Sequence, residues 1–531
     1  MARKAIAIVL AAGWAAGLAG AEDLIRLDKA RFLDKCQGAW AGQMIGVCYG
    51  DRYEFVSNAK PITTPMHDWK SADIERSLGQ DDIYVEMTFL KALEDFGLDI
   101  SYEQAGKAFA DSEYPLWHAN RVGRDNVRRG VMPPLSGHPD YNRHADDIDF
   151  QIEADLFGII CPGLPWESNR LGGIFGHVMN YGDGVYGGLF VAGMYAAAYL
   201  EDHDIMKVIR AGMDCIPKQT EYWRCIADTL RWHQMYPDDW LAAWKKIEAR
   251  WQDDVDCSPG NPFNIDAKIN GAYIVMGLVY GEGDVLKTAQ ISARCGQDSD
   301  CNPSNAVGVL GCMRGLSGFD PVWTSGLPAM EGKKFIFTDY SFKTLIEASQ
   351  RVAEQVVQRA GGQVEADSYL LPVQKPKPPA TLEQWINQAE VLVAPISAWE
   401  MQEWDPAWKV TACGHDMEPG VRPEQYGRES VLVLHPVDKE TPAAIEADLN
   451  VPKGARRLDL EVASDQKGDF RLRVLLNDGV AHEEIIDTKG QWKTISVKLG
   501  RHAAETVHVR IENAPNGWSF EAAYLDAISV R

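Results

Sequence analysis

The sequence predicts two domains of different class, an all-α domain followed by a β-sandwich. Three observations support this prediction. From about residue 27 to 360, apolar residues recur at helical spacing and alternating strand patterns are nearly absent. Four prolines then lie close together, at positions 372, 376, 378 and 379. Beyond about residue 385, short segments alternate apolar and polar residues, as strands do. We therefore assign residues 22–371 to the helical domain, 372–385 to a proline-rich linker and 386–531 to the sandwich.

The first 21 residues, MARKAIAIVLAAGWAAGLAGA, are predicted to be a signal peptide. Arg3 and Lys4 form a basic start, an apolar run follows, and Ala19-Gly20-Ala21 is a small-residue cleavage site. The alternative is a membrane anchor, but the apolar run is short and rich in alanine and glycine. We expect the mature chain to begin near Glu22, to be secreted or periplasmic, and not to insert in a membrane.

Four segments of the helical domain show its pattern most clearly. Residues 82–97 carry apolar side chains at helical spacing and stop at Gly97, a residue that commonly ends helices. Residues 187–204 are apolar almost all round, as in a helix buried inside a bundle. Residues 228–251 predict two helices separated at Pro237. Residues 305–318 are small and apolar, which suits close helix packing.

The C-terminal domain is predicted from five alternating segments separated by turn residues. These are residues 456–464, 470–478, 493–500, 506–514 and 522–530. Short strands at this spacing are typical of a β-sandwich, here expected to be jelly-roll-like. Trp492 and Trp518 are candidates for stacking on sugars in a carbohydrate-binding module, although a tryptophan in a small sandwich is more often part of the core.

Charge and cysteine content exclude several classes of protein. The formal net charge is −23, with no basic stripe, which argues against binding to nucleic acid or to anionic lipid. The ten cysteines include no CxxC pair and no zinc-type spacing. They leave room for one or two disulfides, whose pairing the sequence does not specify.

Two pairs of aspartates each precede a predicted helix. Asp81 and Asp82 lie in LGQDDIYVEM, and Asp298 and Asp300 lie in GQDSDCNP. Aspartate is a favoured helix cap, but capping accounts for one carboxylate at each site and leaves the second unexplained. Crowded carboxylates persist when a cation neutralises them, and oxygen ligands suit magnesium, calcium or manganese. Spacing alone leaves a metal site and two acidic caps as alternatives.

Three blocks resemble the ADP-ribosylglycohydrolase family, which includes the dinitrogenase reductase-activating glycohydrolases. The segment GAWAGQMIGVCYGDRYEF at 38–55 is similar to the small-residue opening helix of the family and the acidic segment after it. The segment GQDDIYVEMTFL at 79–90 resembles its Thr/Ser-Asp-Asp-Thr block. The segment GQDSDCNPSNAVGVLGCMRG at 296–315 resembles its Gly-x-Asp-x-Asp-Thr block. The resemblance spans most of residues 30–320 and leaves the C-terminal domain outside it.

The resemblance implies an all-α fold and a binuclear magnesium centre that binds vicinal sugar hydroxyls. By position, its ligands are Asp81, Asp82, Asp298 and Asp300. This chain departs from the family pattern at three places: Gln80 replaces a threonine or serine, and Ile83 and Cys301 each replace a threonine. A thiol is a poor ligand for a hard cation, whereas the Gln80 carbonyl oxygen can still coordinate one. We therefore expect one or two divalent ions, magnesium being favoured over calcium or manganese.

Further acidic and polar residues are candidates for catalysis or substrate binding. Asp149 and Glu153 belong to an acidic run, 144–163, that is interleaved with apolar residues, so we expect one of them to be the general base or acid. Asp183, in the glycine-rich segment MNYGDGVYGG, is a third catalytic candidate. Asn180, Tyr186 and, by position, Glu54 are candidates for substrate binding. Residues 117–139 are expected to form a loop suited to polyol contacts.

These observations lead to an exported, metal-dependent glycoside hydrolase as the expected function. Export makes an extracellular glycan or glycoside the expected substrate. The alternative with the same chemistry is hydrolysis of an N- or O-glycosidic ADP-ribosyl bond. An alternative of a different class is a metal-dependent carbohydrate-binding protein without catalytic activity.

Overall fold

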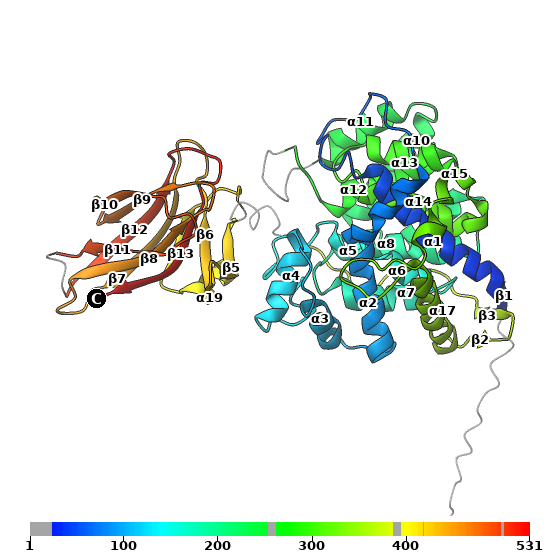
Figure 1. The fold of residues 1–531 in the computed structure, drawn as a ribbon, viewed down its shortest axis with the longest axis horizontal. Helices are drawn as coiled ribbons and strands as arrows, with labels where there is room; N and C mark the ends of the chain where they lie inside the picture. The colour runs from blue at the N-terminus through cyan, green and yellow to red at the C-terminus, as the bar shows by residue number, and fades with distance from the viewer. Residues whose placement is uncertain (1–23, 253–261, 386–394, 418, 501–503) are drawn as a thin grey trace, which may run out of the picture.

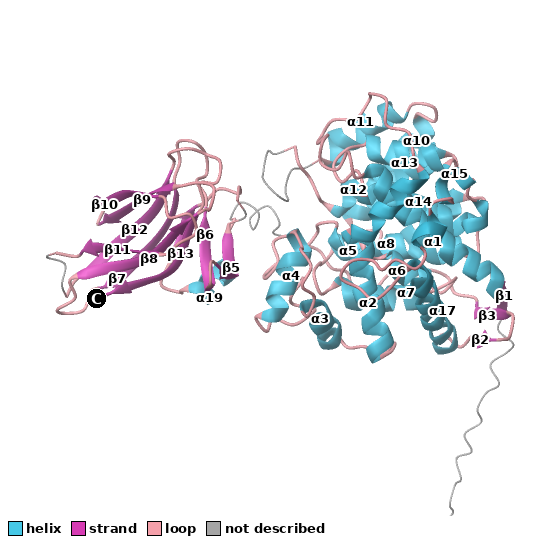
Figure 2. Ribbon diagram, viewed as in Figure 1, coloured by secondary structure: helices cyan, strands magenta, loops and turns pink. Residues whose placement is uncertain are grey.

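The computed structural model describes residues 24–252, 262–385 and 395–531, apart from residues 418 and 501–503. The predicted signal peptide lies outside the described residues. Figures 1 and 2 show a helical domain followed by a separate domain of antiparallel sheets, which confirms the predicted fold class. No helix within the described ranges is both long enough and apolar enough to cross a membrane.

The helices of the first domain include the four predicted segments. Residues 228–251 form two helices on either side of Pro237, as expected from the proline. The long helices are α1 (Lys29–Gly50), α2 (Asp81–Phe96), α3 (Tyr102–Ala110), α4 (His118–Arg128), α7 (Pro165–Gly176), α8 (Asp183–Ala198), α9 (Ile205–Asp214), α10 (Glu221–Met235), α11 (Trp240–Trp251), α12 (Ala267–Gly281), α13 (Val285–Arg294), α14 (Cys301–Arg314) and α17 (Phe342–Arg359). The short ones are η1 (Ser71–Gly79), α5 (Asp149–Ile152), α6 (Asp155–Ile159), η2 (Leu316–Gly318), α15 (Pro321–Thr324) and α16 (Leu327–Met330). The prediction of a loop over 117–139 is wrong for 118–128, where α4 forms.

Helices α1 and α14 pack closely enough that their backbones touch. Glycines recur every four residues along α1 and so lie on one face of it. A Cβ atom at Gly42 would lie 2.4 Å from the carbonyl oxygen of Val307, and one at Gly46 would lie 2.1 Å from that of Pro303. This contact sets the position of the N-terminal end of α14, where Asp298 and Asp300 lie.

A small sheet ties the two ends of the helical domain together. Strand β1 (Leu24–Asp28) pairs with β3 (Ser368–Pro372), which also pairs with β2 (Gln363–Val364). These strands were not predicted from the sequence, because each is short and lies beside a long helix. The pairing places Leu27 opposite Tyr369, and both are buried in the main core.

The C-terminal domain is a sandwich of two five-stranded antiparallel sheets. The domain begins with α19 (Ala398–Trp404) and contains β4 (Lys409–Ala412), β5 (Gly420–Gln425), β6 (Arg428–Leu434), β7 (Ala443–Asn450), β8 (Arg457–Ser464), β9 (Phe470–Leu476), β10 (Gly479–Ile486), β11 (Lys493–Lys498), β12 (Thr506–Ala514) and β13 (Ala523–Val530). One sheet has the order β10-β9-β12-β7-β4 and the other β11-β8-β13-β6-β5. Leu460 and Val474, from different sheets, belong to one core cluster, so the two inner faces pack together.

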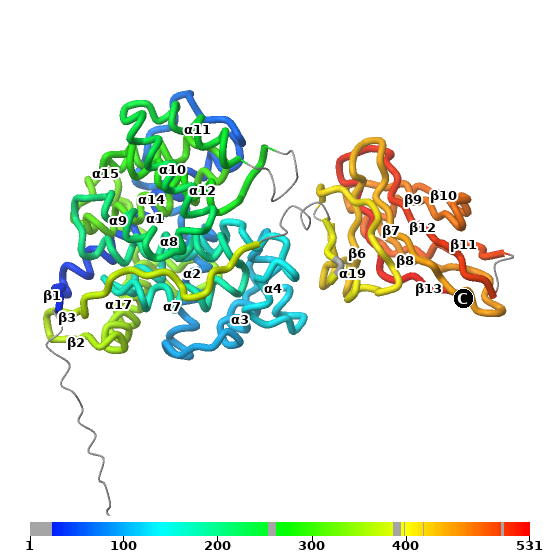
Figure 3. The backbone as a smooth tube through the Cα atoms, turned by 180° about the vertical axis from the view of Figure 1, so that it is seen from behind, coloured from blue at the N-terminus to red at the C-terminus, as the bar shows by residue number. Residues whose placement is uncertain are grey.

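The proline-rich segment 372–385 lies along the surface of the helical domain (Figure 3). Trp166 Nε1 donates a hydrogen bond to the carbonyl oxygen of Lys375 at 2.7 Å, and Asn169 Nδ2 donates to that of Lys377 at 3.1 Å. At the far end, His177 Nε2 lies 2.9 Å from Glu383 Oε1. The segment is therefore docked on α7 and α8 rather than extended into solvent.

The pair of His177 and Glu383 makes this docking sensitive to pH. The hydrogen bond and charge of Glu383 outweigh burial and raise the pKa of His177, and the hydrogen bond and charge of His177 outweigh burial and lower the pKa of Glu383. The contribution of His177 to the stability of the docked linker is fully present below the pKa of an unfolded histidine, about 6.5. It is lost as pH rises through the raised pKa of His177 in the folded protein. The contribution of Glu383 to the same stability is fully present above the pKa of an unfolded glutamate, about 4.3. It is lost as pH falls through the lowered pKa of Glu383 in the folded protein. Docking is therefore strongest between about pH 4.3 and 6.5.

We expect Glu383→Gln to speed proteolytic cleavage of the linker several-fold at pH 6, because the variant loses the ion pair. The difference between the variant and the wild type should become smaller as pH rises to 9, because His177 loses its proton as pH rises through its raised pKa. Cleavage of both proteins is measured by limited proteolysis, with rates corrected for protease activity on an unfolded peptide. Equal cleavage rates at pH 6 would show that the pair does not hold the linker.

Candidate active site

The two aspartate pairs converge although they are more than two hundred residues apart in the sequence. Helix α2 begins at Asp81, and Asp300 directly precedes α14. Ligand atoms of Asp82, Asp300 and Cys301 all lie within 4.8 Å of one another. Burial raises the pKa of Asp300, and Asp298 and Asp81 lie close enough for their charges to raise it further. The structure thus brings together four of the predicted metal ligands.

Helix capping does not account for these carboxylates. Asp298 accepts a hydrogen bond from the Cys301 amide at 3.3 Å, as a cap would, but Asp300 makes no side-chain capping bond. The Gln80 side chain, at the start of α2, makes none either. Oδ1 of Asp82 and Oδ1 of Asp300 are buried without a hydrogen-bond partner. Such atoms are costly unless something outside the chain contacts them.

Burial and mutual repulsion make the aspartates of this site harder to deprotonate. Burial together with the charges of Asp300 and Asp81 raises the pKa of Asp82 well above its ordinary value. Burial, with the charge of Asp82, raises the pKa of Asp298 to about 7. Within the described ranges no lysine or arginine forms an ion pair with any of the four aspartates. A hard cation is the neutralising partner that this set of oxygen atoms fits.

Cys301 stands beside the carboxylates as a neutral thiol. Its Sγ atom donates to Asp82 Oδ2 at 3.4 Å. Burial and four neighbouring aspartates raise its pKa well above the usual value, so it stays protonated. The thiol therefore orients Asp82 and adds no charge to the site. These residues fit one hard cation better than two.

Glu54 reaches the same group from the loop that follows α1. Phe55 N donates to the carbonyl oxygen of Gln297 at 3.0 Å, and Gln297 N donates to that of Ser57 at 3.1 Å, so the two loops are joined. Phe55 and Gln297 both have positive φ, a strained conformation that the paired loops maintain. Partial desolvation and the charges of Asp300 and Asp81 raise the pKa of Glu54 to about 8. Glu54 is exposed, whereas Asp82, Asp298 and Asp300 are buried and Asp81 is half-buried.

Asp149 and Glu153 lie on the other side of Asp81 and hold the start of α4. The amides of Ala119 and Asn120 donate to the two Asp149 oxygens, at 3.2 and 3.3 Å. Asn120 Nδ2 donates to Glu153 Oε1 at 2.5 Å. Burial raises the pKa of Asp149 to about 7, although these amides lower it. Both residues therefore border the site, with hydrogen bonds directed to α4.

Three other sequence candidates lie away from this group. Asp183 accepts from the Tyr222 amide at 2.9 Å, and Lys268 and Asp266 are the charges nearest to it. Asn180 is buried and bonds to the backbone of the 145–150 segment. The Tyr186 hydroxyl accepts from Glu383 N of the linker at 2.7 Å. Of the three, Tyr186 contacts the linker, and these hydrogen bonds of Asp183 and Asn180 lie within the helical domain, away from the aspartates.

A second layer of buried acidic residues beneath the aspartates was not predicted from the sequence. Glu86 lies one turn after Asp82 on α2, and its Oε2 accepts from Leu156 N at 2.7 Å. Asp155 accepts from Tyr195 at 2.6 Å and from Asn305 at 2.7 Å. The four-residue spacing of Asp82 and Glu86 is the signal that could have identified Glu86, because both lie on one helix face.

A second group of side chains could also hold a metal ion. His144 Nδ1 and His118 Nδ1 lie 2.8 and 3.9 Å from Asp147 Oδ2. Burial, with the charges of His118, Arg143 and Arg121, lowers the pKa of His144 well below its usual value. A cation is less favoured here than among the aspartates.

Both tryptophans of the sandwich are held by their own domain. Trp492 Nε1 donates to the carbonyl oxygen of Tyr426 at 3.0 Å, and Trp518 packs edge-on against His435 with ring centroids 4.8 Å apart. No disulfide forms among the nine described cysteines.

Residues 28–363 match the family model for ADP-ribosylglycohydrolase. No curated protein matches the chain. A solved ADP-ribosylglycohydrolase-related protein complex is 14% identical, with a TM-score of 0.38, and the match covers 61% of this chain and 99% of that one. A family 35 carbohydrate binding module from an environmental isolate is 15% identical, with a TM-score of 0.19, covering 24% of this chain and 89% of the module. The matched region includes the converging aspartates and extends over more than half of the sequence, so the chain belongs to the ADP-ribosylglycohydrolase family of glycosidic-bond hydrolases.

Proposed function

We propose that the protein is an exported, metal-dependent glycoside hydrolase acting on an extracellular glycan or glycoside. The observation that carries this proposal is the convergence of Asp81, Asp82, Asp298 and Asp300 without a basic partner. Magnesium is the expected ion, with calcium or manganese as substitutes. When bound, such an ion supplies a Lewis-acidic anchor for vicinal sugar hydroxyls.

Glu54 is the residue that we assign to proton transfer. It is open to solvent, whereas Asp149 and Glu153 are buried. Asp149 directs both of its oxygens to α4 and Glu153 directs Oε1 there. In this assignment, Glu54 exchanges a proton with water or with the leaving oxygen as the glycosidic bond breaks. Asp149 and Glu153 are positioning residues that hold α4 beside the site.

Aromatic side chains provide an apolar wall beside Glu54. The rings of Phe55 and Phe263 meet edge to face with centroids 4.7 Å apart, and His118 lies 6.0 Å from Phe263. A wall of this kind suits the apolar face of a sugar ring and restricts water near the bond being broken.

Hydrolysis of an ADP-ribosyl bond is the second candidate function, because the family match itself favours it. Both candidates are tested by assaying the purified protein with magnesium against nitrophenyl glycosides, polysaccharides and ADP-ribosyl-arginine. Release of sugar from the glycosides or polysaccharides supports our proposal. Turnover of ADP-ribosyl-arginine alone would replace it with the second candidate. Binding of a glycan without turnover of any substrate would instead indicate a carbohydrate-binding protein.

Glu54→Gln is expected to lower kcat by about 10²- to 10⁴-fold with little change in KM, because the amide binds as well but transfers no proton. Glu153→Gln should have a smaller effect on kcat, because its contact with Asn120 can persist. Glu113→Gln, at an exposed position, is the matched control and should leave kcat unchanged. Steady-state kinetics of the three variants tests the assignment, and a larger loss in Glu153→Gln than in Glu54→Gln would reverse it.

A further inference from the structure

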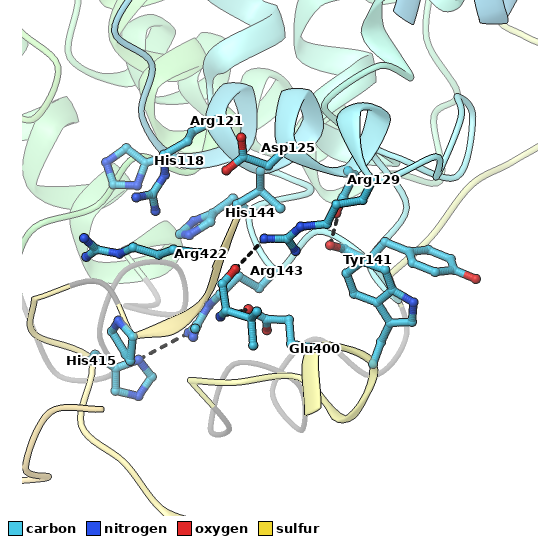
Figure 4. A pocket seen from close by; sticks show the side chains of 16 residues that line it. His118, Arg121, Asp125, Arg129, Tyr141, Arg143, His144, Glu400, His415 and Arg422 are labelled. Atoms are coloured by element: carbon cyan, nitrogen blue, oxygen red, sulfur yellow. Dashed lines mark hydrogen bonds between the residues drawn. The ribbon is translucent and has the colours of Figure 1, made fainter. Parts of the chain in front are cut away.

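A cleft lies between the helical domain and the sandwich. Its walls come from α4 and residues 141–144 on one side, and from residues 399–400, 415 and 419–422 on the other. Figure 4 shows the labelled side chains of both walls directed toward one another. The cleft has a volume of about 160 Å³, enough for a small polar group.

The lining of this cleft is basic, although the chain carries a net charge of −23. Two acidic side chains line it, Asp125 and Glu400. Four arginines face them: Arg121, Arg129, Arg143 and Arg422. Glu400 accepts from Ser397 N at 2.8 Å and from Val421 N at 3.0 Å, which orients its carboxylate without cancelling its charge. The arginines still outnumber the acidic side chains by four to two.

Two of these arginines are held in place by neutral acceptors. Arg129 Nη2 donates to the carbonyl oxygen of Val421 at 2.5 Å, which also joins the two walls. Arg422 donates to the carbonyl oxygen of Met417 at 3.1 Å and to Gln425 Oε1 at 2.9 Å. Neutral acceptors orient a guanidinium without cancelling its charge, so each can still attract an oxyanion.

The lowered pKa of His415, a histidine in the cleft, is consistent with the same positive charge. His415 Nδ1 lies 3.2 Å from Arg143 Nη2. Burial and the charge of Arg143 lower the pKa of His415 to about 4. At neutral pH its ring is uncharged, so it can donate one hydrogen bond without adding charge.

The cleft and the carboxylates lie on opposite sides of the first turn of α4. His118, the first residue of that helix, lines the cleft. The next two residues, Ala119 and Asn120, donate their amides to Asp149 on the acidic side. A substrate that spans this turn meets negative charge at one end and positive charge at the other, which favours one orientation of a ligand with an anionic end.

We infer that this cleft binds an oxyanion substituent of the substrate, and that the substrate is an acidic glycan carrying sulfate or carboxylate groups. Guanidinium groups match the geometry of both groups. The inference rests on the proposed function, because it takes the bound anion to be part of a substrate. The other source of an oxyanion, the pyrophosphate of an ADP-ribosyl compound, is distinguished by experiment.

Equilibrium binding of the full-length protein to dextran sulfate, neutral dextran and ADP-ribose tests the inference. We expect binding to dextran sulfate that weakens with salt, and at least about tenfold weaker binding to dextran and to ADP-ribose. Arg121→Gln/Arg422→Gln should weaken dextran sulfate binding at least about tenfold, because each arginine provides a charge-assisted contact. Arg121→Lys/Arg422→Lys should retain more of the binding, because it keeps the charge and loses only the guanidinium fork.

Arg210→Gln/Arg457→Gln is the matched control, with the same change in net charge and one substitution in each domain, outside the cleft. It should change binding less than about twofold, and thermal unfolding checks that all variants fold. Equal weakening by the two glutamine pairs, equal binding of dextran and dextran sulfate, or tight ADP-ribose binding that depends on Arg121 and Arg422 would each overturn the inference. The assay needs no turnover. Dextran sulfate binding that depends on the cleft, in a protein that cleaves no glycoside, would therefore refute the proposed function and leave the anion site in place.

Discussion

Asp82→Asn is expected to abolish turnover, with kcat/KM reduced by at least on the order of 10³-fold, while the helical fold is retained. The Asp82 side chain is 1% exposed and lies within 4.8 Å of ligand atoms of Asp300 and Cys301. Asparagine has the same shape but lacks the charge that a cation needs. The loss of repulsion should also raise the melting temperature of the metal-free protein, because one of several crowded carboxylates is gone.

Calorimetry separates this effect from simple damage to the fold. In chelator, the variant should melt above the wild type. In excess magnesium, the wild type should gain stability through binding and the variant should gain little. Asp238→Asn, at an exposed position between α10 and α11, should behave as the wild type in both conditions. A variant that melts lower than the wild type in chelator would contradict the account of crowded, uncompensated charge.

Gly46→Ala is expected to destabilise the helical domain by about 3 kcal/mol or more. The added methyl group would lie 2.1 Å from the carbonyl oxygen of Pro303 on α14, and a backbone atom cannot move aside as a side chain can. The melting temperature of the domain should fall by several degrees. One kcal/mol corresponds to about 2–4 °C at 150–250 residues, and to less in a larger domain such as this one. Activity should also fall, because α14 carries Asp298 and Asp300 at its start.

Gly173→Ala provides the matched control within another helix, α7. No atom lies within 4 Å of the added methyl group, so the substitution should stabilise the helix by about 0.5–1 kcal/mol. Differential scanning calorimetry of both variants measures the contrast. If both alanine variants shift the melting temperature equally, the packing of α1 on α14 is less close than described.

The sequence was sufficient to predict the fold class and much of the helical framework, because periodicity and turn residues are local signals. Gly97 and Pro237 lie where helices end, and the small residues of 305–318 predicted the close packing of α14, which the structure shows against α1. Strands β4 to β7 and β10 were not individually predicted, since their side chains alternate less regularly than those of the five predicted strands. Helix α4 was missed because its polar and arginine-rich surface obscures the small apolar face that it buries.

The candidate site was predictable to the extent that its residues occur as local pairs. Asp81 with Asp82 and Asp298 with Asp300 stood out by spacing, and the resemblance to a family assigned them a role. The orientation of Asp149 and Glu153 toward α4 was not predictable, since it depends on packing between distant segments. The basic cleft is likewise invisible in the sequence, because its two walls are separated by more than two hundred residues.

Turnover with and without metal tests the central claim most directly. The purified protein is treated with excess chelator, assayed on the glycoside that it hydrolyses, and assayed again after magnesium is restored. We predict that activity is lost in chelator and recovered with magnesium, and that the Asp82→Asn variant recovers none. Full activity in excess chelator would contradict the claim that the four aspartates bind a catalytic cation.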